Sequence, residues 1–302
     1  MTSCYNTFKL KAAVRLSARE KLMSIRIITD SNCDLPQTMV DEYGITVVPM
    51  YINIGSKSYL DGVTMSRQEF YEGLPHFDSH PMTSVPGPGT VIETFDRLAD
   101  EGATEILAIH VAGSLSAMVN SARLAAEEWD RVPVTVFDSG NLTLGTGLQV
   151  LAAAKTASEG HTMDQIVTLL EDTASRTYCF AALDTVEFLR RSGRLTRFQS
   201  SLASVLRIKP LLKMNNGEFD MERIRTRRAA LARVIELLSG LGSLEELTLV
   251  HTHAPEQAEA LGREAGSLVP EGGFSLSAEV TPVIGTHIGP GAVGFVAIKA
   301  RE

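Results

Sequence analysis

The feature that most constrains the fold is an alternation of short apolar segments with longer amphipathic segments along the first half of the chain. The short segments are typical of buried strands, and strands that alternate with helices form parallel sheets. We therefore predict an α/β unit with a parallel, Rossmann-like sheet. The predicted strands are 25–29, 45–54, 105–111 and 134–137, and the predicted helices cover 116–129 and 142–158.

Polar residues follow three of these strands. Asp30 follows the first, the segment 112–116 follows the strand that ends at Val111, and Asp138 with Ser139 follows the fourth. In open α/β sheets ligands bind beyond the carboxyl ends of the strands. We expect these polar groups to converge at that edge.

Two connections in this half carry their own predictions. Asp34 is expected to cap a helix that contains Pro36 in its first turn and stops at Gly44. The segment 74–89 is rich in Pro, Gly and His and is expected to be a long loop. Loops of this length are usually functional or disordered.

The pattern changes from His161 onward, where shorter strands alternate with helices, so a second domain of mixed α/β type is predicted. The chain has 302 residues, about twice the length of a typical domain. We predict a disordered extension at 1–23, an N-terminal α/β domain at 24–160 and a C-terminal α/β domain at 161–302. In the second domain the predicted helices are 163–174, 185–191 and 227–239, and the predicted strands are 178–183, 219–225 and 247–250.

Composition excludes several classes of function. A net charge of -8 and a pI near 5.5 argue against a nucleic-acid-binding face, which needs clustered Lys and Arg. The three cysteines, Cys4, Cys33 and Cys179, are too few and too scattered for a disulfide framework. No apolar segment approaches the roughly 20 residues that span a bilayer. These features predict a cytoplasmic protein without a stable membrane anchor.

Two hydroxyl-rich turns are candidate anion sites. Thr83 and Ser84 precede a Pro-rich stretch and a predicted helix, whose N–H groups could bind an anion with them. Ser116 lies where a strand turns into a helix, a position that suits a carboxylate and also resembles a nucleophile elbow with His287 as a later base. The alternative for both turns is an ordinary helix cap.

Three further patterns carry little weight alone. Residues 289–294 match G-x-G-x-x-G, but the eight residues that follow are too few for a dinucleotide-binding unit. His251 and His253 have the spacing of a metal pair if their strand continues, yet no third ligand is evident. Two groups of arginines, at 190–197 and 223–228, could bind an anion or an acidic partner, or could be solvated and paired locally.

Taken in order, several short motifs resemble the DegV family across the chain from Ile25 onward, although each is weak alone. They are Asp30-Ser31-x-x-Asp34-Leu35, Thr83-Ser84-x-Pro86, Leu115-Ser116, Asp138-Ser139, Glu187-Phe188-Leu189 with Gly193-Arg194, Lys209-Pro210, and Thr286-His287-Ile288-Gly289-Pro290-Gly291.

The resemblance implies two α/β domains with a lipid tunnel between them, and a role as the fatty-acid-binding subunit of a bacterial fatty acid kinase. It implies that Thr83, Ser84, Ser116 and His287 hold the carboxylate of a long-chain fatty acid. The chain would then have no catalytic residue, metal or cofactor of its own, and a partner kinase would phosphorylate the ligand.

The resemblance also assigns a role to three arginines, and the chain departs from the family motifs at two places. Arg194, Arg225 and Arg228 would dock the kinase or stabilise charge beside the tunnel mouth. The family usually has Ser-Gly-Thr-Tyr where this chain has residues 116–119 as Ser-Ala-Met-Val, and Thr-Ser-Gln-Pro-Ser where this chain has residues 83–87 as Thr-Ser-Val-Pro-Gly. Both changes remove hydrogen-bonding groups near the expected carboxylate. The competing hypothesis is a serine hydrolase of lipid esters that uses Ser116 and His287.

Overall fold

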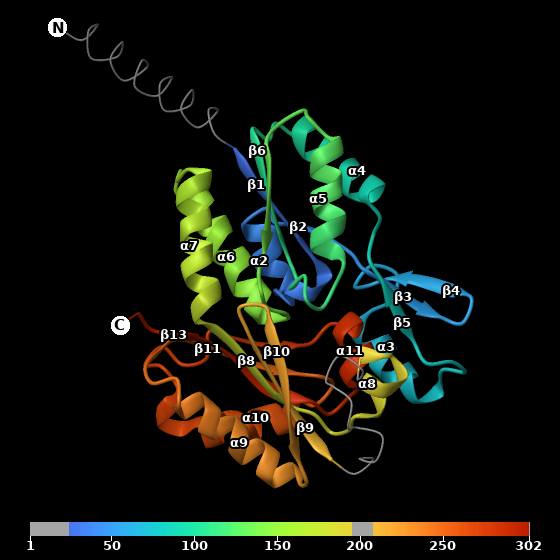
Figure 1. Ribbon diagram of the computed structural model, residues 1–302, viewed down its shortest axis with the longest axis vertical. Coiled ribbons are helices and arrows are strands. Elements are labelled where there is room, and N and C mark those ends of the chain that lie inside the picture. Colours follow the sequence, from blue (N-terminus) through green and yellow to red (C-terminus); the bar gives the residue numbers. More distant parts are fainter. Residues whose placement is uncertain (1–23, 195–207, 302) are drawn as a thin grey trace, which may run out of the picture.

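The first sheet is parallel, as the alternating pattern predicts. The computed structural model describes residues 24–194 and 208–301, and its four-stranded sheet has the order β2-β1-β6-β7 with every neighbouring pair parallel (Figure 1). The strands are β1 (Ile25–Asp30), β2 (Thr46–Val48), β6 (Glu105–His110) and β7 (Val134–Asp138). Central strand β6 is buried along nearly its whole length, as expected for a sheet covered on both faces.

Helices cover both faces of this sheet because its strands are apolar on both sides. One face packs against α4 and α5 around Phe95, Ile106 and Met118. The other packs against α2, α6 and α7 around Ile27 and Leu107. The helices are α2 (Gln37–Glu42), α4 (Pro88–Asp100), α5 (Met118–Glu128), α6 (Leu144–Ser158) and α7 (Met163–Arg176).

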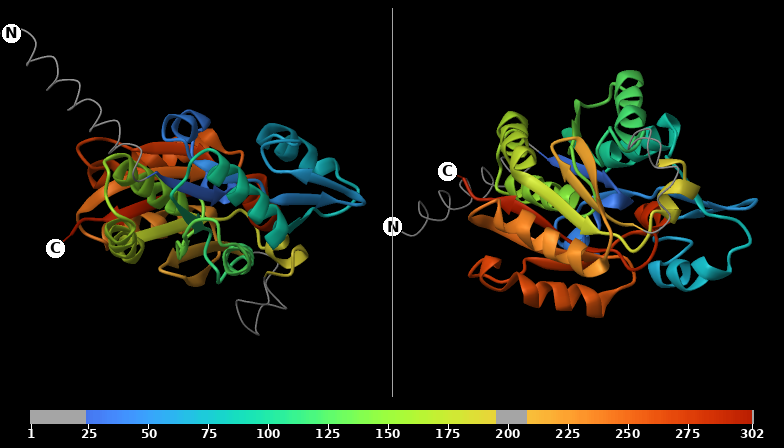
Figure 2. Two further views of the ribbon diagram at one scale, coloured as in Figure 1. Left: turned by 90° about the horizontal axis from the view of Figure 1, so that it is seen from above. Right: turned by 60° about the horizontal axis from the view of Figure 1, so that its bottom comes forward.

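A second, mixed sheet forms the other half of the molecule. Its order is β10-β9-β8-β13-β11-β12, antiparallel except for the β11–β12 pair. Its outer face is covered by α9 (Arg227–Ser239) and α10 (Pro255–Ala265), which lie below the sheet in Figure 1 and come forward in the right view of Figure 2. The strands are β8 (Thr177–Ala182), β9 (Lys209–Asn215), β10 (Glu218–Ile224), β11 (Leu244–His251), β12 (Leu276–Glu279) and β13 (Val293–Lys299).

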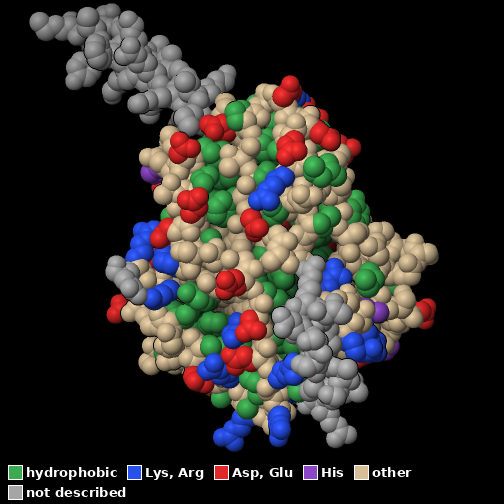
Figure 3. Space-filling model, in the orientation of Figure 1, with side chains coloured by type: hydrophobic (Ala, Val, Ile, Leu, Met, Phe, Trp, Pro, Cys, Tyr) green, Lys and Arg blue, Asp and Glu red, His purple; other side chains and the backbone are tan. Residues whose placement is uncertain are grey.

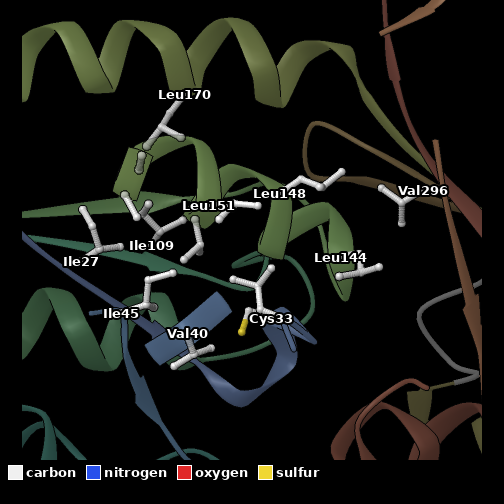
Figure 4. Packing of buried hydrophobic residues seen from close by; sticks show 14 of the residues in the cluster. Ile27, Cys33, Val40, Ile45, Ile109, Leu144, Leu148, Leu151, Leu170 and Val296 are labelled. Carbon is white, nitrogen blue, oxygen red and sulfur yellow. The ribbon is translucent and has the colours of Figure 1, made fainter. Parts of the chain in front are cut away.

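Helix α6 joins the two halves into one packed body. Its residues Leu148 and Leu151 belong to one buried cluster that also contains Ile109 of the first sheet and Val296 of the second. Figure 4 shows these side chains converging on α6 from both sides. The two halves therefore share a hydrophobic layer, which fixes the space between them.

A third, small unit lies at the side of this interface. It contains the antiparallel sheet β4-β3-β5, which projects laterally in Figure 1 and in the left view of Figure 2. It packs against helices α3 and α11, and α11 in turn contacts α8. The bounds are β3 (Tyr51–Ile54), β4 (Lys57–Leu60), β5 (Met82–Ser84), α3 (Arg67–Gly73), α8 (Glu187–Arg191) and α11 (Pro282–Ile288), with 3₁₀ turns at Ser31–Cys33, Leu74–His76 and Gly266–Leu268.

The division of the chain near residue 160 stays a prediction. This position lies in the turn between α6 and α7, and α7 packs beside α6. The second sheet begins only with β8, after α7 has ended. The predicted extension at 1–23 lies outside the described residues.

Three local predictions were wrong. The segment 45–54 contains two strands that belong to different sheets. Pro49 lies between β2 and β3, and proline is poorly accommodated within a paired strand. The segment 74–89 contains strand β5, which pairs with β3 over three residues. Asp34 does not cap α2: it adopts a left-handed conformation with φ 53°, and Pro36 occupies the cap position.

Within residues 24–194 and 208–301, no helix combines the length and the apolar character needed to cross a bilayer.

Candidate functional site

A cavity of about 430 Å³ lies where the two halves and the side unit meet. Apolar side chains provide most of its wall, and elements from the beginning, middle and end of the chain contribute to it. The lining residues are Asn32, Met50, Thr83, Ser84, Val85, Val111, Leu115, Ser116, Ala117, Leu142, Leu189, Arg194, Leu212, Phe219, Val283, Ile284, His287 and Ile288. All four residues expected to hold a carboxylate, together with Arg194, line this cavity.

Thr83 and His287 form a polar pair in the cavity wall. Thr83 lies on β5, where pairing with Ile52 of β3 fixes its position. Thr83 Oγ1 lies 3.0 Å from His287 Nε2, although the two residues are 204 positions apart in the sequence. The hydroxyl and the imidazole are therefore presented together to any polar group that enters the cavity.

The local sequence around His287 explains its position. Helix α11 begins after Thr281, whose hydroxyl accepts a hydrogen bond from the backbone N–H of Val283 at 3.4 Å. It ends with Ile288, and the cap residue Gly289 has φ 72° and lies so close to Phe188 that a Cβ would be 2.2 Å from its ring. Only glycine fits there, so the glycine-rich string ends the helix one residue after His287.

Ser116 lies in the connection between β6 and α5, one residue before the cap of the helix. Its Oγ accepts a hydrogen bond from the backbone N–H of Met118 at 3.2 Å, whereas the cap position itself belongs to Ala117. The nearby backbone N–H of Gly113 donates to both carboxylate oxygens of Asp138, at 3.1 and 3.2 Å. A hydrolase would need such amides for an oxyanion, so this arrangement does not favour the serine hydrolase alternative.

The polar groups at the strand ends do lie close together, but they form hydrogen bonds mainly with one another. Asp30 is fully buried and accepts hydrogen bonds from the backbone N–H of Val111 at 3.1 Å and from Nδ1 of His110 at 3.0 Å. It also accepts from the backbone and the side-chain amide of Asn32, at 3.0 and 2.9 Å. Asp30 therefore supports the wall of the cavity, because its oxygens are already used within the protein.

Ser84 is the most exposed of the predicted carboxylate ligands. Its Oγ accepts a hydrogen bond from Nδ2 of Asn53 at 3.1 Å. Thr83 is half-buried, whereas Ser84 points to the opposite side of β5, as neighbouring residues of a strand do. Of the two, Thr83 has the better position to contact a ligand inside the cavity.

The predicted arginines are divided between two places. Arg194 lines the cavity, and its guanidinium donates to the backbone oxygen of Ser192 at 2.8 Å. Arg225 and Arg228 are exposed at the connection from β10 to α9 and do not line the cavity. On the face shown in Figure 3, Lys and Arg side chains gather mainly on the lower half, which carries the second sheet.

Other arginines of the first basic group are paired locally. Arg190 and Arg191 both donate to Glu187 one turn earlier in α8, at 2.7 Å each. These hydrogen bonds lower the pKa of Glu187 to about 2. Since both arginines are exposed and Glu187 is only half-buried, the pairs add little to stability.

The possible metal pair is not formed. Strand β11 ends at His251, and His253 has φ 50°, so the two side chains do not continue one strand face. His253 contacts Glu279 at 3.1 Å and stacks on Tyr71. Among the residues that the structure describes, no group of three or more His, Cys, Asp or Glu side chains could hold a metal ion.

A buried ionic network ties the two halves together beside the cavity. Asp34 binds Arg67 at 2.9 Å, the hydroxyl of Thr143 at 2.6 Å and the backbone N–H of Thr281 at 2.9 Å. The Thr281 hydroxyl donates to Asp61. Burial raises the pKa of Asp34 to about 7, and Arg67 opposes this shift. The network fixes the start of α11 and therefore the position of His287.

Sequence reasoning missed most of the apolar wall and one polar member of it. Met50, Leu142, Phe219 and Val283 line the cavity, but each looks like an ordinary core residue in the sequence. Asn32 was also missed, although its position two residues after Asp30, at the end of a parallel strand, was a usable signal. Apolar residues that line a cavity cannot be told from core residues by pattern alone.

These features define a class: a two-unit α/β protein with a mainly apolar cavity between the units. The chain belongs to the DegV family, because the family model described as an uncharacterised protein, DegV family, matches residues 24–300. A DegV domain-containing protein of Streptomyces coelicolor is 35% identical over 276 residues, which cover 90% of this chain and 97% of the relative. A relative from Deinococcus radiodurans is 37% identical over 279 residues, with coverage of 90% and 97%.

Solved structures show the same fold. A DegV family protein from Thermus thermophilus, described by its fatty acid binding, superposes with a TM-score of 0.81 at 31% identity, covering 92% of this chain and 100% of that protein. DegV from Bacillus subtilis, described as a fatty acid binding protein, has a TM-score of 0.82 at 27% identity, with coverage of 92% and 100%. The predicted DegV membership and two-part α/β fold are confirmed.

Proposed function

We propose that this protein binds one long-chain fatty acid in the cavity between its two halves. The observation that carries the proposal is the combination of a mainly apolar wall with the Thr83–His287 pair and Ser116. Similar proteins from Thermus thermophilus and Bacillus subtilis are described as binding fatty acids. A ligand with an apolar chain and one polar end matches this lining.

The acyl chain provides most of the affinity. Burial of one methylene group contributes about 0.8 kcal/mol, so a chain of about 15 methylenes contributes about 12 kcal/mol before ordering costs are subtracted. A cavity of about 430 Å³ lies within the usual range of about 300–1,000 Å³ for small-molecule sites. The fatty acid is therefore retained by its tail.

The carboxylate is held by hydrogen bonds that offset its loss of water. Thr83, Ser116 and His287 each present a group that can donate to an anionic oxygen, and Ser84 contributes at the edge of the site. A carboxylate needs such partners, because burying an ion without them is costly. These groups orient the head of the ligand and set which oxygen faces outward.

We further propose that the protein presents this carboxylate to a partner kinase, which transfers the γ-phosphoryl group of ATP to give an acyl phosphate. The attacking carboxylate oxygen forms a bond to phosphorus, and ADP leaves. Arg194 stabilises charge at the site, and Arg225 and Arg228 dock the partner. The ATP-bound metal and the phosphoryl-transfer residues belong to the kinase.

Native mass spectrometry of the freshly purified protein tests the binding step. We expect one fatty acid per chain, released and identified after denaturation. An empty protein that also fails to take up added palmitic or oleic acid would refute the proposal. Labelling of Ser116 by a fluorophosphonate, without bound lipid, would revive the hydrolase alternative.

Phosphorylation is tested by mixing the lipid-loaded protein with ATP and the fatty acid kinase of the same organism, then trapping acyl phosphate with hydroxylamine. Arg225→Glu combined with Arg228→Glu should lower the rate of hydroxamate formation without lowering the lipid content. Arg263→Glu, on the exposed face of α10, is the control. Unchanged rates in the double variant would remove these arginines from the docking surface.

A further inference from the structure

The side chain of Asn32 is held in one orientation in the wall of the cavity. Its Nδ2 donates to Asp30 Oδ1 at 2.9 Å, and its backbone N–H donates to the same oxygen at 3.0 Å. A carboxylate only accepts hydrogen bonds, so the amide nitrogen must face Asp30 and the amide oxygen must face away. Asp30 is itself fixed by His110 and Val111, so it cannot rotate to release the amide.

The amide oxygen of Asn32 is buried and lacks a hydrogen-bond partner among the described residues. The residue is 2% exposed, yet it lines the cavity. Nearly all buried acceptors in folded proteins are paired, because an unpaired one loses its bonds to water without replacement. An acceptor that is fixed, buried and adjacent to an apolar cavity indicates a ligand that brings a donor.

The carboxylate of a fatty acid cannot satisfy this acceptor, because an ionised carboxylate accepts hydrogen bonds and donates none. The amide nitrogen of Asn32 contacts Asp30 and the sulfur of Met50, so the oxygen is the atom of the side chain that is left for a ligand. The donor that would pair with Asn32 therefore belongs to the acyl chain.

We propose that the preferred ligand is a hydroxy fatty acid whose in-chain hydroxyl donates to Oδ1 of Asn32. This inference rests on the proposed fatty-acid binding and specifies the class of ligand. Met50, whose sulfur contacts Asn32, and Val111, whose backbone N–H bonds the same Asp30, have apolar side chains that would not compete for the hydroxyl. Sites built to bond a hydroxyl discriminate strongly against the analogue that lacks it, because the buried partner is then left unpaired.

Competition binding on the delipidated protein tests this inference. The probes are stearic acid, a series of hydroxystearic acids with the hydroxyl at different carbons, and methyl-branched acids with the same branch positions. Methyl matches the bulk of hydroxyl but cannot donate. At the branch position that lies next to Asn32, the hydroxy acid should bind roughly five- to thirty-fold tighter than the methyl-branched acid with the same branch position.

Two variants locate the effect. Asn32→Leu should remove the preference for the hydroxy acid while stearic acid still binds. Gln149→Leu removes another buried amide, from α6 away from the cavity lining, and should leave the preference unchanged. If Asn32→Leu does not fold, the wild-type comparison of hydroxy and methyl-branched acids decides alone.

The outcomes separate this inference from the proposed function. If stearic acid binds and no hydroxy acid in the series binds more tightly than its methyl partner, the hydroxyl proposal is overturned and fatty-acid binding stands. If no acid in the series binds, fatty-acid binding itself fails. A preference that persists in Asn32→Leu assigns the hydroxyl to another residue and also overturns the proposal.

Discussion

Replacing His287 with alanine separates the contributions of the head and the tail of the ligand. The imidazole Nε2 lies 3.0 Å from Thr83 Oγ1, at the polar part of an otherwise mainly apolar wall. Loss of one hydrogen bond to a charged group costs about 1.5–3 kcal/mol, or roughly a 10- to 150-fold rise in Kd. This cost should be the same for every chain length, because we propose that His287 contacts the carboxylate and not the acyl chain.

The chain-length series gives the second quantity. In the wild type each added methylene should lower Kd about four-fold, which corresponds to about 0.8 kcal/mol, until the cavity is full. Isothermal titration calorimetry with saturated acids of about 10 to 18 carbons measures both effects, because this range changes the buried apolar area stepwise. His287→Ala should shift the plot of binding free energy against chain length without changing its slope.

His253→Ala is the matched control for this experiment. His253 stacks on Tyr71 and contacts Glu279 but does not line the cavity. Its removal should change neither the slope nor the intercept. A reduced slope in His287→Ala would show that the ring contacts the acyl chain, and our division of the cavity into head and tail regions would be wrong.

Three further predictions concern stability. Gly294→Ala should lower the melting temperature strongly, because a Cβ would lie 2.1 Å from a backbone oxygen of β8, whereas Gly272→Ala, with no atom within 4 Å, should be silent. Leu148→Ala in α6 should lose about 2–5 kcal/mol of unfolding free energy in urea, and the exposed Leu124→Ala less than about 0.5 kcal/mol. Burial raises the pKa of Asp34 to about 7, so the folded state binds its proton more tightly than the unfolded state, with a carboxyl pKa of about 3.9. Stability should therefore fall relative to Asp34→Asn as pH rises from about 4 to about 7, and a constant difference between pH 4.5 and 7.5 would contradict this.

The sequence predicted the larger elements well where local pattern and tertiary environment agree. Strands β1, β6 and β7 and helices α6 and α9 form close to their predicted bounds, because each is a long apolar or amphipathic segment with clear ends. The prediction failed at 45–54, where the apolar pattern runs through Pro49 although the chain changes sheets there. A strand as short as β5 has too few residues to show a period.

The candidate site was predicted in part. Thr83, Ser84, Ser116, His287 and Arg194 all line one cavity, as the motif resemblance led us to expect. Their roles toward a ligand stay predictions.

The sequence by itself determined the alternating parallel unit and the polar ends of its strands. These depend on residue type, period and backbone freedom, which are local properties. Only the tertiary structure decided that Thr83 and His287 lie 3.0 Å apart and that the Asn32 oxygen is buried without a partner in the described part of the chain. Such facts depend on which distant segments pack together, and side-chain period and propensity carry no information about that.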